Sequence, residues 1–204
     1  MSGASARSRG RPRLFDEEAV LDELTSLFWE KGYAHTSMAD LVEASGVHKS
    51  SLYSTFGSKE ELFSKILHRY LDGRMDGLSA LIEQAGSGIE GIHSFLELMR
   101  ESIVTGGNRQ GCLLVNSASE LRGTAPGFEN FGVEYRAALR ARIRELILQA
   151  QPEDVPSSVV TDQRTDLFVT FMAGLNVTVR GGADEVEIGR VIDAMHATVD
   201  TWRA

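Results

Sequence analysis

The chain has 204 residues, of which 42% are hydrophobic, and this is enough apolar material for the core of one or two domains. Its net charge of -8, from 21 basic and 29 acidic side chains, excludes a protein that coats nucleic acid with a globally basic surface, so any contact with DNA must be local. A single cysteine, Cys112, excludes an intrachain disulfide, and neither a secretory signal nor an apolar run of about 18 residues occurs, so we expect a soluble, cytoplasmic chain that binds no membrane.

The N-terminal segment, residues 1–13, is basic and contains no acid. Arg7, Arg9, Arg11 and Arg13 are interleaved with Ser, Gly and Pro, a composition that cannot bury a core. We therefore expect a flexible, arginine-rich arm. Taken alone, a solvated tail and an arm that contacts nucleic acid explain this segment equally well.

The rest of the chain is predicted to be all-α, because apolar residues recur at intervals of three and four and only four prolines are present. The first helix is expected over residues 16–31, since Asp16 is placed to cap its first turn. Gly32 follows the last turn and provides a natural stop.

Two short helices follow the first one. The earlier begins at Thr36 or Ser37, with Asp40 placed to complete a capping box. Gly46 supplies the left-handed conformation that a sharp turn needs, and the second short helix is expected over residues 48–55. Two short helices that meet at a glycine turn, after a longer bracing helix, form the pattern of a helix-turn-helix, whose second helix enters the major groove of DNA.

The next helix begins at Ser58, with Glu61 as the reciprocal capping partner. A loose segment over residues 73–77 is expected to interrupt the helical pattern, before a further amphipathic stretch over residues 78–84. Residues 86–91 match G-x-G-x-x-G, but a helix and not a strand precedes them, so we interpret them as a helix-to-helix linker and not as a dinucleotide site. Further helices are expected near residues 92–104, 111–122, 128–150, 157–179 and 185–203.

The outward side of the helix over residues 48–55 is polar throughout. Leu52 and Phe56 take the inward positions, and every outward residue carries a hydrogen-bonding group. These outward residues are His48, Lys49, Ser50, Ser51, Tyr53 and Ser54. Small hydroxyls allow a close approach to base edges and phosphates, and Lys49 adds a cation, whereas a merely solvated helix more often carries Glu, Lys and Gln.

Four motifs keep their spacing across residues 15–70. They are Phe28-x-x-x-Gly32-Tyr33, Thr36-Ser37-Met38-x-Asp40-Leu41, Ala44-x-Gly46-Val47 and Ser51-Leu52-Tyr53-x-x-Phe56-x-Ser58-Lys59-x-x-Leu62. Together with residues 10–13, they resemble the DNA-binding domain of the TetR family of bacterial transcriptional regulators nearly throughout. The resemblance implies a three-helix, helix-turn-helix DNA-binding domain over residues 14–58. It also implies a helical ligand-binding and dimerisation domain over residues 59–204.

The resemblance further implies contacts with a double-stranded DNA operator. It assigns groove and phosphate contacts to Thr36, Ser37, Lys49, Ser50, Ser51 and Tyr53, although a packed ring is an equal alternative for Tyr53. Lys59, at the start of a helix, resembles the family's phosphate clamp. His48 departs from the family, which often has Ser or Thr there, and it stays a candidate without an assigned base. Arg11 and its arm are expected to enter the adjacent minor groove and to raise affinity more than specificity.

A palindromic operator requires a two-fold symmetric protein, so we expect a homodimer. Two apolar stripes in the last two helices fit such an interface. One stripe is Leu167, Phe168, Phe171 and Leu175, and the other is Ile188, Val191, Ile192, Met195 and Val199. Either stripe also fits the core of one subunit, but the two-fold symmetry of the operator favours a four-helix interface between subunits.

A small-molecule effector site is expected among the helices near residues 92–104 and 111–122 and the long helix after Phe128. The candidate lining residues are Phe95, Met99, Cys112, Asn116, Phe131, Tyr135 and Met172. Each of them also fits an ordinary core. Residues 111–121 resemble a segment of a TetR-like subset that includes electrophile-sensing repressors, so Cys112 is either a sensor thiol or a buried, inert cysteine.

Two other classes of protein fit the sequence less well. An all-helical enzyme has no support, since no G-x-S-x-G, P-loop or H-E-x-x-H pattern occurs and the histidines form no i,i+4 pair, so no catalytic residue, metal or cofactor is assigned. A helical adaptor for a partner protein leaves the polar surface of residues 48–54 unexplained. We therefore predict a repressor that a small molecule releases from its operator. The small molecule stabilises a conformation in which the two DNA-binding domains of the dimer no longer match successive half-sites.

Overall fold

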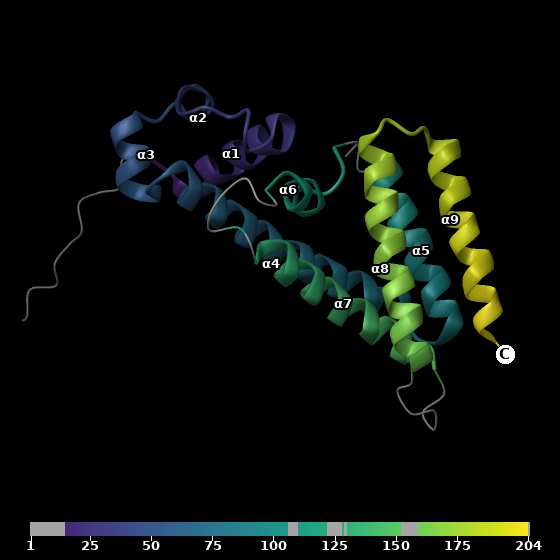
Figure 1. Ribbon diagram of the computed structural model, residues 1–204. Coiled ribbons are helices and arrows are strands. Elements are labelled where there is room, and N and C mark those ends of the chain that lie inside the picture. The colour runs from purple at the N-terminus through teal and green to yellow at the C-terminus, as the bar shows by residue number, and fades with distance from the viewer. Residues whose placement is uncertain (1–14, 106–109, 122–127, 129, 152–158, 204) are drawn as a thin grey trace, which may run out of the picture.

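The computed structural model describes residues 15–105, 110–121, 128, 130–151 and 159–203. Its helices, labelled in Figure 1, are α1 (Glu17–Lys31), α2 (Met38–Ser45), α3 (Lys49–Phe56), α4 (Lys59–Ala85), α5 (Gly88–Thr105), α6 (Leu113–Leu121), α7 (Phe131–Gln149), α8 (Val159–Arg180) and α9 (Glu185–Asp200), with a 3-10 turn over Thr201–Arg203. The described ranges contain helices and no strand, which confirms the predicted all-α fold. None of the described helices has the length and apolarity that a membrane span requires. Arg11 and the rest of the expected arm lie outside the described residues.

Helices α1, α2 and α3 gather at one end of the molecule, and the expected capping residues set their ends (Figure 1). The Asp16 carboxylate accepts a hydrogen bond from Glu18 N at 3.0 Å. Ser37 and Asp40 form both halves of a capping box at the start of α2. The C-cap of α2 is Gly46, whose φ of 64° strains any residue with a Cβ, so glycine permits the sharp turn into α3.

The long helix α4 is continuous where the sequence indicated a break. It runs for 27 residues, so the loose segment expected over residues 73–77 is wrong. Gly73 and Gly77 lie within the helix, where each costs roughly 1 kcal/mol relative to alanine. The buried stripe of α4 continues past both glycines through Leu62, Phe63, Ile66, Leu67, Met75, Leu78 and Ile82. Burial of this stripe, at roughly 25 cal/mol per Å² of apolar surface, offsets the two glycines.

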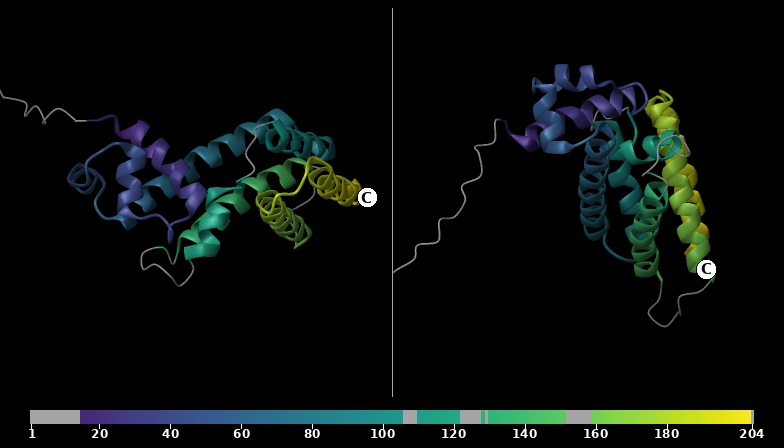
Figure 2. Two further views of the ribbon diagram at one scale, coloured as in Figure 1. Left: turned by 90° about the horizontal axis from the view of Figure 1, so that it is seen from above. Right: turned by 60° about the vertical axis from the view of Figure 1, so that its left-hand side comes forward.

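Helix α4 joins two hydrophobic cores. The N-terminal core packs α1, α2 and α3 against the first turns of α4 and against α6, and the rings of Phe28 and Phe63 lie in it with centroids 4.5 Å apart. The second core lies between the second half of α4 and helices α5, α7, α8 and α9. Figure 2 shows the N-terminal body at one end of α4 and the helical bundle at the other. The fold thus holds α3 at a distance from the bundle, and the long helix α4 reaches from one core to the other.

Candidate functional site

The outward side of α3, the α3 face, consists of His48, Lys49, Ser50, Ser51, Tyr53 and Ser54. Leu52 and Phe56 are 1% and 6% exposed, and their burial fixes which side of α3 points outward. Tyr53 is 42% exposed, which excludes a packed ring, and Lys49 Nζ lies 5.7 Å from the centroid of that ring. His48 precedes α3 and provides no side-chain cap, so the positive end of the helix is open to an anion. The α3 face therefore combines hydroxyls and a cation, and α3 contains no acid.

The two candidates that precede α2 have different surroundings. Ser37 is exposed, and its hydroxyl oxygen accepts a hydrogen bond from Asp40 N at 3.2 Å. The side chain of Thr36 is 1% exposed, and its Oγ1 donates to Gly32 O at 2.6 Å. The hydroxyl of Thr36 thus faces the protein interior, and the expected groove contact does not fit its side chain. Thr36 instead closes the turn between α1 and α2.

The carboxylate of Asp40 links α2 to the end of α1. Lys31 Nζ donates to Asp40 Oδ1 at 2.7 Å, and Ser37 N donates to Asp40 Oδ2 at 2.7 Å. These hydrogen bonds, with that from Lys31 the largest cause, hold the pKa of Asp40 well below its ordinary value. A group with a lowered pKa stabilises the fold above its unfolded pKa and loses this effect as the pH falls. At neutral pH the ionised Asp40 therefore stabilises the packing of α2 against the end of α1.

Ser37→Ala is expected to lower the free energy of unfolding by about 1 kcal/mol, because Asp40 N loses its acceptor. Ser26→Ala is the matched control, since the Ser26 hydroxyl donates to Asp22 O within α1, where alanine favours the helix. Urea unfolding followed by circular dichroism measures both variants. An unchanged unfolding midpoint for Ser37→Ala contradicts the capping role.

Lys59, the first residue of α4, binds the backbone of residues 32–36, which we call the α1–α2 loop. Its Nζ donates to Tyr33 O and to Thr36 O, each at 2.6 Å, and lies 4.2 Å from the centroid of the Tyr33 ring. Burial lowers the pKa of Lys59, while the charges of Glu120 and Asp40 oppose that shift. The ammonium expected to clamp a DNA phosphate is thus bound to the backbone of this loop.

Helix α6 holds the α1–α2 loop from the other side. The Glu120 carboxylate accepts hydrogen bonds from Tyr33 N at 3.1 Å and from Ala34 N at 2.7 Å. A Cβ on Gly32, which has a φ of 80°, would lie 2.9 Å from Glu120 Oε2, so glycine allows this close approach. Figure 1 shows α6 between the N-terminal body and the bundle. Because α6 begins directly after Cys112, one short helix links the buried Cys112 with the loop that precedes α2.

A cavity of about 90 Å³ lies where α4, α5 and α8 meet the residues before α6. Three of the ligand-site candidates, Met99, Cys112 and Met172, line it together. A fourth candidate, Tyr135 on α7, lies next to the Cys112 sulfur. The structure thus brings these four residues into one place.

The other three candidates lie elsewhere. Phe95 packs against Phe168 in the second core, with ring centroids 5.9 Å apart. Phe131 is 5% exposed and belongs to the N-terminal core. Asn116 Nδ2 donates to Gln110 O at 3.0 Å, and its side chain lines an outer groove beside α6. None of these side chains lines the cavity.

Four polar residues of the cavity wall were not anticipated from the sequence: Tyr70, Arg74, Ser102 and Asn176. The expected break over residues 73–77 placed Arg74 outside a helix, although it lies one turn after Tyr70 on the same side of α4. Ser102 follows Met99 by three positions on α5, and Asn176 follows Met172 by four on α8. Positions three or four residues from a predicted lining residue lie on the same side of its helix, and this spacing could have identified Ser102 and Asn176.

The phenols of Tyr70 and Tyr135 are largely buried around the Cys112 thiol. Burial raises the pKa of both phenols, the adjacent Cys112 adds to each rise, and the Arg74 guanidinium opposes it. Cys112 is itself 4% exposed. In the described ranges, no group of three or more His, Cys, Asp or Glu is arranged to hold a metal ion.

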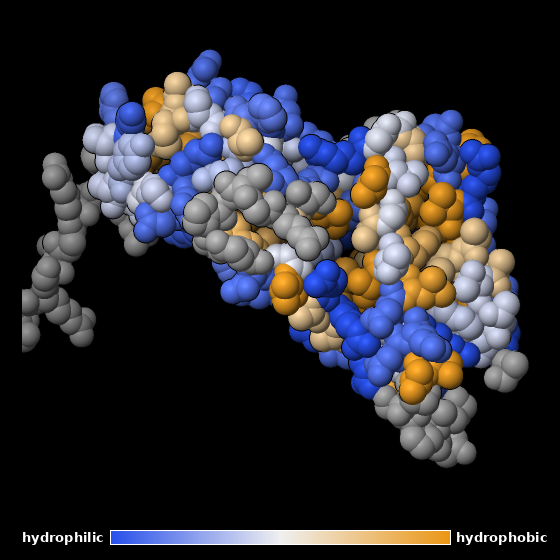
Figure 3. Space-filling model, in the orientation of Figure 1, coloured by the Kyte–Doolittle hydropathy of each residue, from blue (hydrophilic) through white to orange (hydrophobic). Residues whose placement is uncertain are grey.

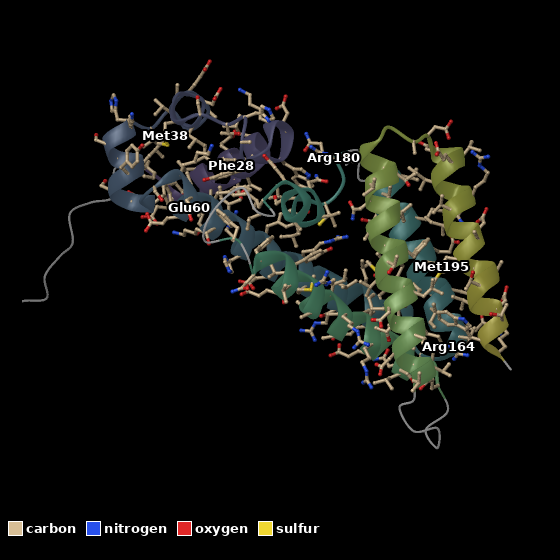
Figure 4. The ribbon with its side chains drawn as sticks, viewed as in Figure 1. Phe28, Met38, Glu60, Arg164, Arg180 and Met195 are labelled. Atoms are coloured by element: carbon tan, nitrogen blue, oxygen red, sulfur yellow. The ribbon has the colours of Figure 1, made fainter. Side chains whose placement is uncertain are left out.

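The outer surface of α8 and α9 carries an apolar groove, the α8–α9 face. Leu167, Phe171, Val191, Ala194 and Met195 line it, and Leu167 is 46% exposed. Apolar residues are visible over these helices in Figure 3, and Met195 is labelled in Figure 4. Six residues of the two predicted stripes belong to the second core: Phe168, Leu175, Ile188, Ile192, Met195 and Val199. The stripes are therefore mostly core, and their three remaining members, Leu167, Phe171 and Val191, line the groove.

Comparison with known proteins places these features in a family. The model described as "Bacterial regulatory proteins, tetR family" matches residues 20–66, from α1 into α4. The HTH-type transcriptional repressor ComR of Escherichia coli (strain K12) is 28% identical over 198 residues, which cover 96% of this chain and 93% of ComR. The repressor BdcR of the same organism is 27% identical over 177 residues, which cover 87% of this chain and 85% of BdcR.

A solved structure agrees with these relatives. It contains a cysteine mutant of the TetR family transcriptional regulator CifR in complex with a 26-bp double-strand operator DNA. This chain matches it with a TM-score of 0.74 and 26% identity, over 92% of this chain and 98% of that one. The chain therefore belongs to the TetR family of bacterial regulatory proteins and is a transcriptional regulator of the helix-turn-helix type.

Proposed function

We propose that the chain is a homodimeric repressor that binds a palindromic double-stranded DNA operator through α3 and is released by a small molecule. The α3 face carries this proposal, because it is an exposed surface of hydroxyls and a cation on a chain whose net charge is -8. The proposed contacts come from Ser37 and from His48, Lys49, Ser50, Ser51 and Tyr53 of this face. Arg11 is proposed to enter the minor groove, on the basis of the sequence alone.

The α8–α9 face is proposed as the site of the second copy. A half-exposed leucine beside an apolar groove is stabilised when an identical surface covers it, and a two-fold axis brings such a surface. CifR is described with a 26-bp operator, which is long enough for two half-sites about 10 bp apart. A dimer through this face gives one molecule two α3 faces for such a duplex.

The proposed division of the chain separates α1, α2 and α3 from the bundle, and α6 with the first turns of α4 packs in the N-terminal core between them. Residues 14–58 are proposed to read DNA, and residues 59–204 to bind the effector and dimerise. The small molecule is proposed to occupy the cavity beside Cys112. Because α6 begins there and Glu120 binds the α1–α2 loop, a shift of α6 changes the position of α2 and α3. DNA and effector then oppose each other through linkage.

Cys112 is proposed as a buried part of the cavity wall, because it is 4% exposed. A sensor thiol reacts with electrophiles and loses that response when the sulfur is replaced. Release of the parent from DNA by electrophiles, together with no release of Cys112→Ser, would assign the sensor role instead.

Glu120→Gln is expected to speed hydrogen exchange of the Tyr33 and Ala34 amides by at least about tenfold, because the neutral amide holds these N–H groups less strongly than the carboxylate. The same change is expected to reduce the effect of an effector on DNA affinity, since α6 is less firmly attached to the loop. Hydrogen exchange measured by NMR at single amides tests the contact directly.

Glu23→Gln is the matched control for this prediction, because Glu23 is exposed on α1 and the change removes the same charge. It is expected to leave exchange at Tyr33 and Ala34 unchanged. Equal exchange rates in Glu120→Gln, Glu23→Gln and the parent rule out the proposed attachment of α6 to the loop.

Selection of bound sequences from random duplexes tests the proposed function as a whole. We expect enrichment of a palindrome, and we expect affinity for it to fall steeply as salt rises, because phosphate contacts release counterions. A helical adaptor predicts neither result. Absence of any enriched duplex at low ionic strength contradicts the proposal.

A further inference from the structure

The cavity between α4, α5 and α8 restricts its occupant by size. Its volume of about 90 Å³ is smaller than the roughly 150 Å³ of an apolar protein cavity that holds benzene. An occupant of on the order of four to six non-hydrogen atoms fits this volume, and a nucleotide or a polycyclic ligand is too large. Much of the wall is aliphatic or thioether, with Met99, Ile103, Met172 and Leu175 among its members.

Arg74 gives this small cavity a positive charge. In the part of the chain that the structure describes, no carboxylate pairs with Arg74, whereas Arg69 on the same helix bonds Glu18 at 3.0 Å and Asp22 at 2.7 Å. Arg74 lines the cavity, and its positive charge acts on the phenols of Tyr70 and Tyr135 beside it. A half-buried cation without a counter-charge is stabilised by an anion that enters beside it.

The planar fork of a guanidinium matches a carboxylate, to which it donates two parallel hydrogen bonds. We propose that the cavity binds a short-chain aliphatic monocarboxylate, with its carboxylate on Arg74 and its alkyl chain against Met99 and Met172. Ser102 and Asn176 add hydrogen-bonding groups to the same wall. An inorganic anion leaves the methionine wall without an apolar partner, and a neutral alcohol or amide leaves the guanidinium without a counter-charge.

This inference rests on the proposed role of the cavity as the effector site. Gly111 and Cys112 belong to the cavity wall and directly precede α6. A carboxylate held by Arg74 on α4 therefore lies against the start of the helix whose Glu120 holds the α1–α2 loop. The proposed ligand site thus adjoins the start of α6, the helix that contacts the α1–α2 loop.

Calorimetric titration of the full chain without DNA tests the ligand class. The probes are acetate, propionate, butyrate and hexanoate, with butyramide and butan-1-ol as neutral molecules of matched size. We expect saturable binding of butyrate that is at least about tenfold tighter than that of butyramide or butanol. Hexanoate is expected to bind more weakly than butyrate, because its chain needs more volume than the cavity of about 90 Å³ provides.

Arg74→Met is expected to weaken butyrate binding by at least about tenfold and to leave butanol binding unchanged. Arg74→Lys keeps the charge but loses the fork, so its affinity lies between the two, and it serves as the test if Arg74→Met does not fold. Arg142→Met is the matched control, because Arg142 pairs with Glu145 on the surface of α7. Circular dichroism establishes that each variant is folded.

Three results overturn the inference: butyramide that binds as tightly as butyrate, Arg74 variants that bind butyrate like the parent, or a parent that binds none of the carboxylates. These measurements contain no DNA, so their failure leaves the proposed operator binding standing. Conversely, a chain that binds butyrate through Arg74 but no duplex overturns the proposed function and retains the ligand assignment.

Discussion

Lys49→Glu is expected to lower affinity for the selected operator by at least about 100-fold, while the free energy of unfolding changes by less than about 0.5 kcal/mol. Lys49 is exposed on the α3 face and contributes nothing to either core, so its replacement leaves the fold intact. The new carboxylate repels DNA phosphates in both copies of a dimer, which doubles the effect per duplex. Fluorescence anisotropy with a labelled operator at several salt concentrations measures the affinity and its salt slope.

Arg136→Glu makes the same change of charge on the exposed surface of α7 and serves as the control. It is expected to reduce affinity far less, because the net charge changes equally but the position is remote from α3. Lys49→Glu is also expected to reduce the salt slope by about one for each phosphate that the lysine no longer neutralises. If the two variants bind the operator with equally reduced affinity, only net charge matters and the α3 face is not the reading surface.

Leu167→Glu is expected to convert the dimer into a monomer and to weaken operator binding by at least about 100-fold. Leu167 is 46% exposed, so a charge there is tolerated in a single copy. In the proposed dimer the same carboxylate is desolvated against Phe171 and Val191, which costs several kcal/mol, and Arg190 of the same groove offsets this cost only in part. Sedimentation velocity measures the mass, and the same anisotropy assay measures the loss of DNA affinity.

Val133→Glu is the matched control for Leu167→Glu. Val133 is an exposed apolar residue of α7, 56% exposed, and does not line the α8–α9 face. This variant is expected to remain dimeric and to bind DNA like the parent. A dimeric Leu167→Glu protein with intact DNA binding contradicts the assignment of the interface.

The N-terminal helices were predictable because their ends depend on neighbours in the sequence. Asp16 and Ser37 cap the helices that they precede, and Gly46 makes the turn that its φ requires. Such signals act within one turn of helix, so spacing alone reveals them. The hydroxyl of Thr36 was harder to place, because whether it faces solvent or Gly32 O depends on how α1 and α2 pack.

The bundle was less predictable because its features depend on contacts distant in sequence. Gly73 and Gly77 indicate a break by local propensity, but burial of the stripe from Leu62 to Ile82 keeps α4 intact. The error also hid Arg74 from the expected cavity. Apolar spacing on the last two helices suited a core and an interface equally, and only packing distinguished buried Phe168 from exposed Leu167.

Repression in the proposed form requires two copies of α3 in successive major grooves of one duplex. The direct measurement is the stoichiometry and affinity of the protein on the selected palindrome, compared with the same palindrome whose half-sites are moved apart by half a helical turn, about 5 bp. We expect two chains per duplex and a loss of affinity of at least about 100-fold after the insertion, because the second α3 then faces the wrong side of the helix. One chain per duplex, or equal affinity for both spacings, contradicts this mode of binding.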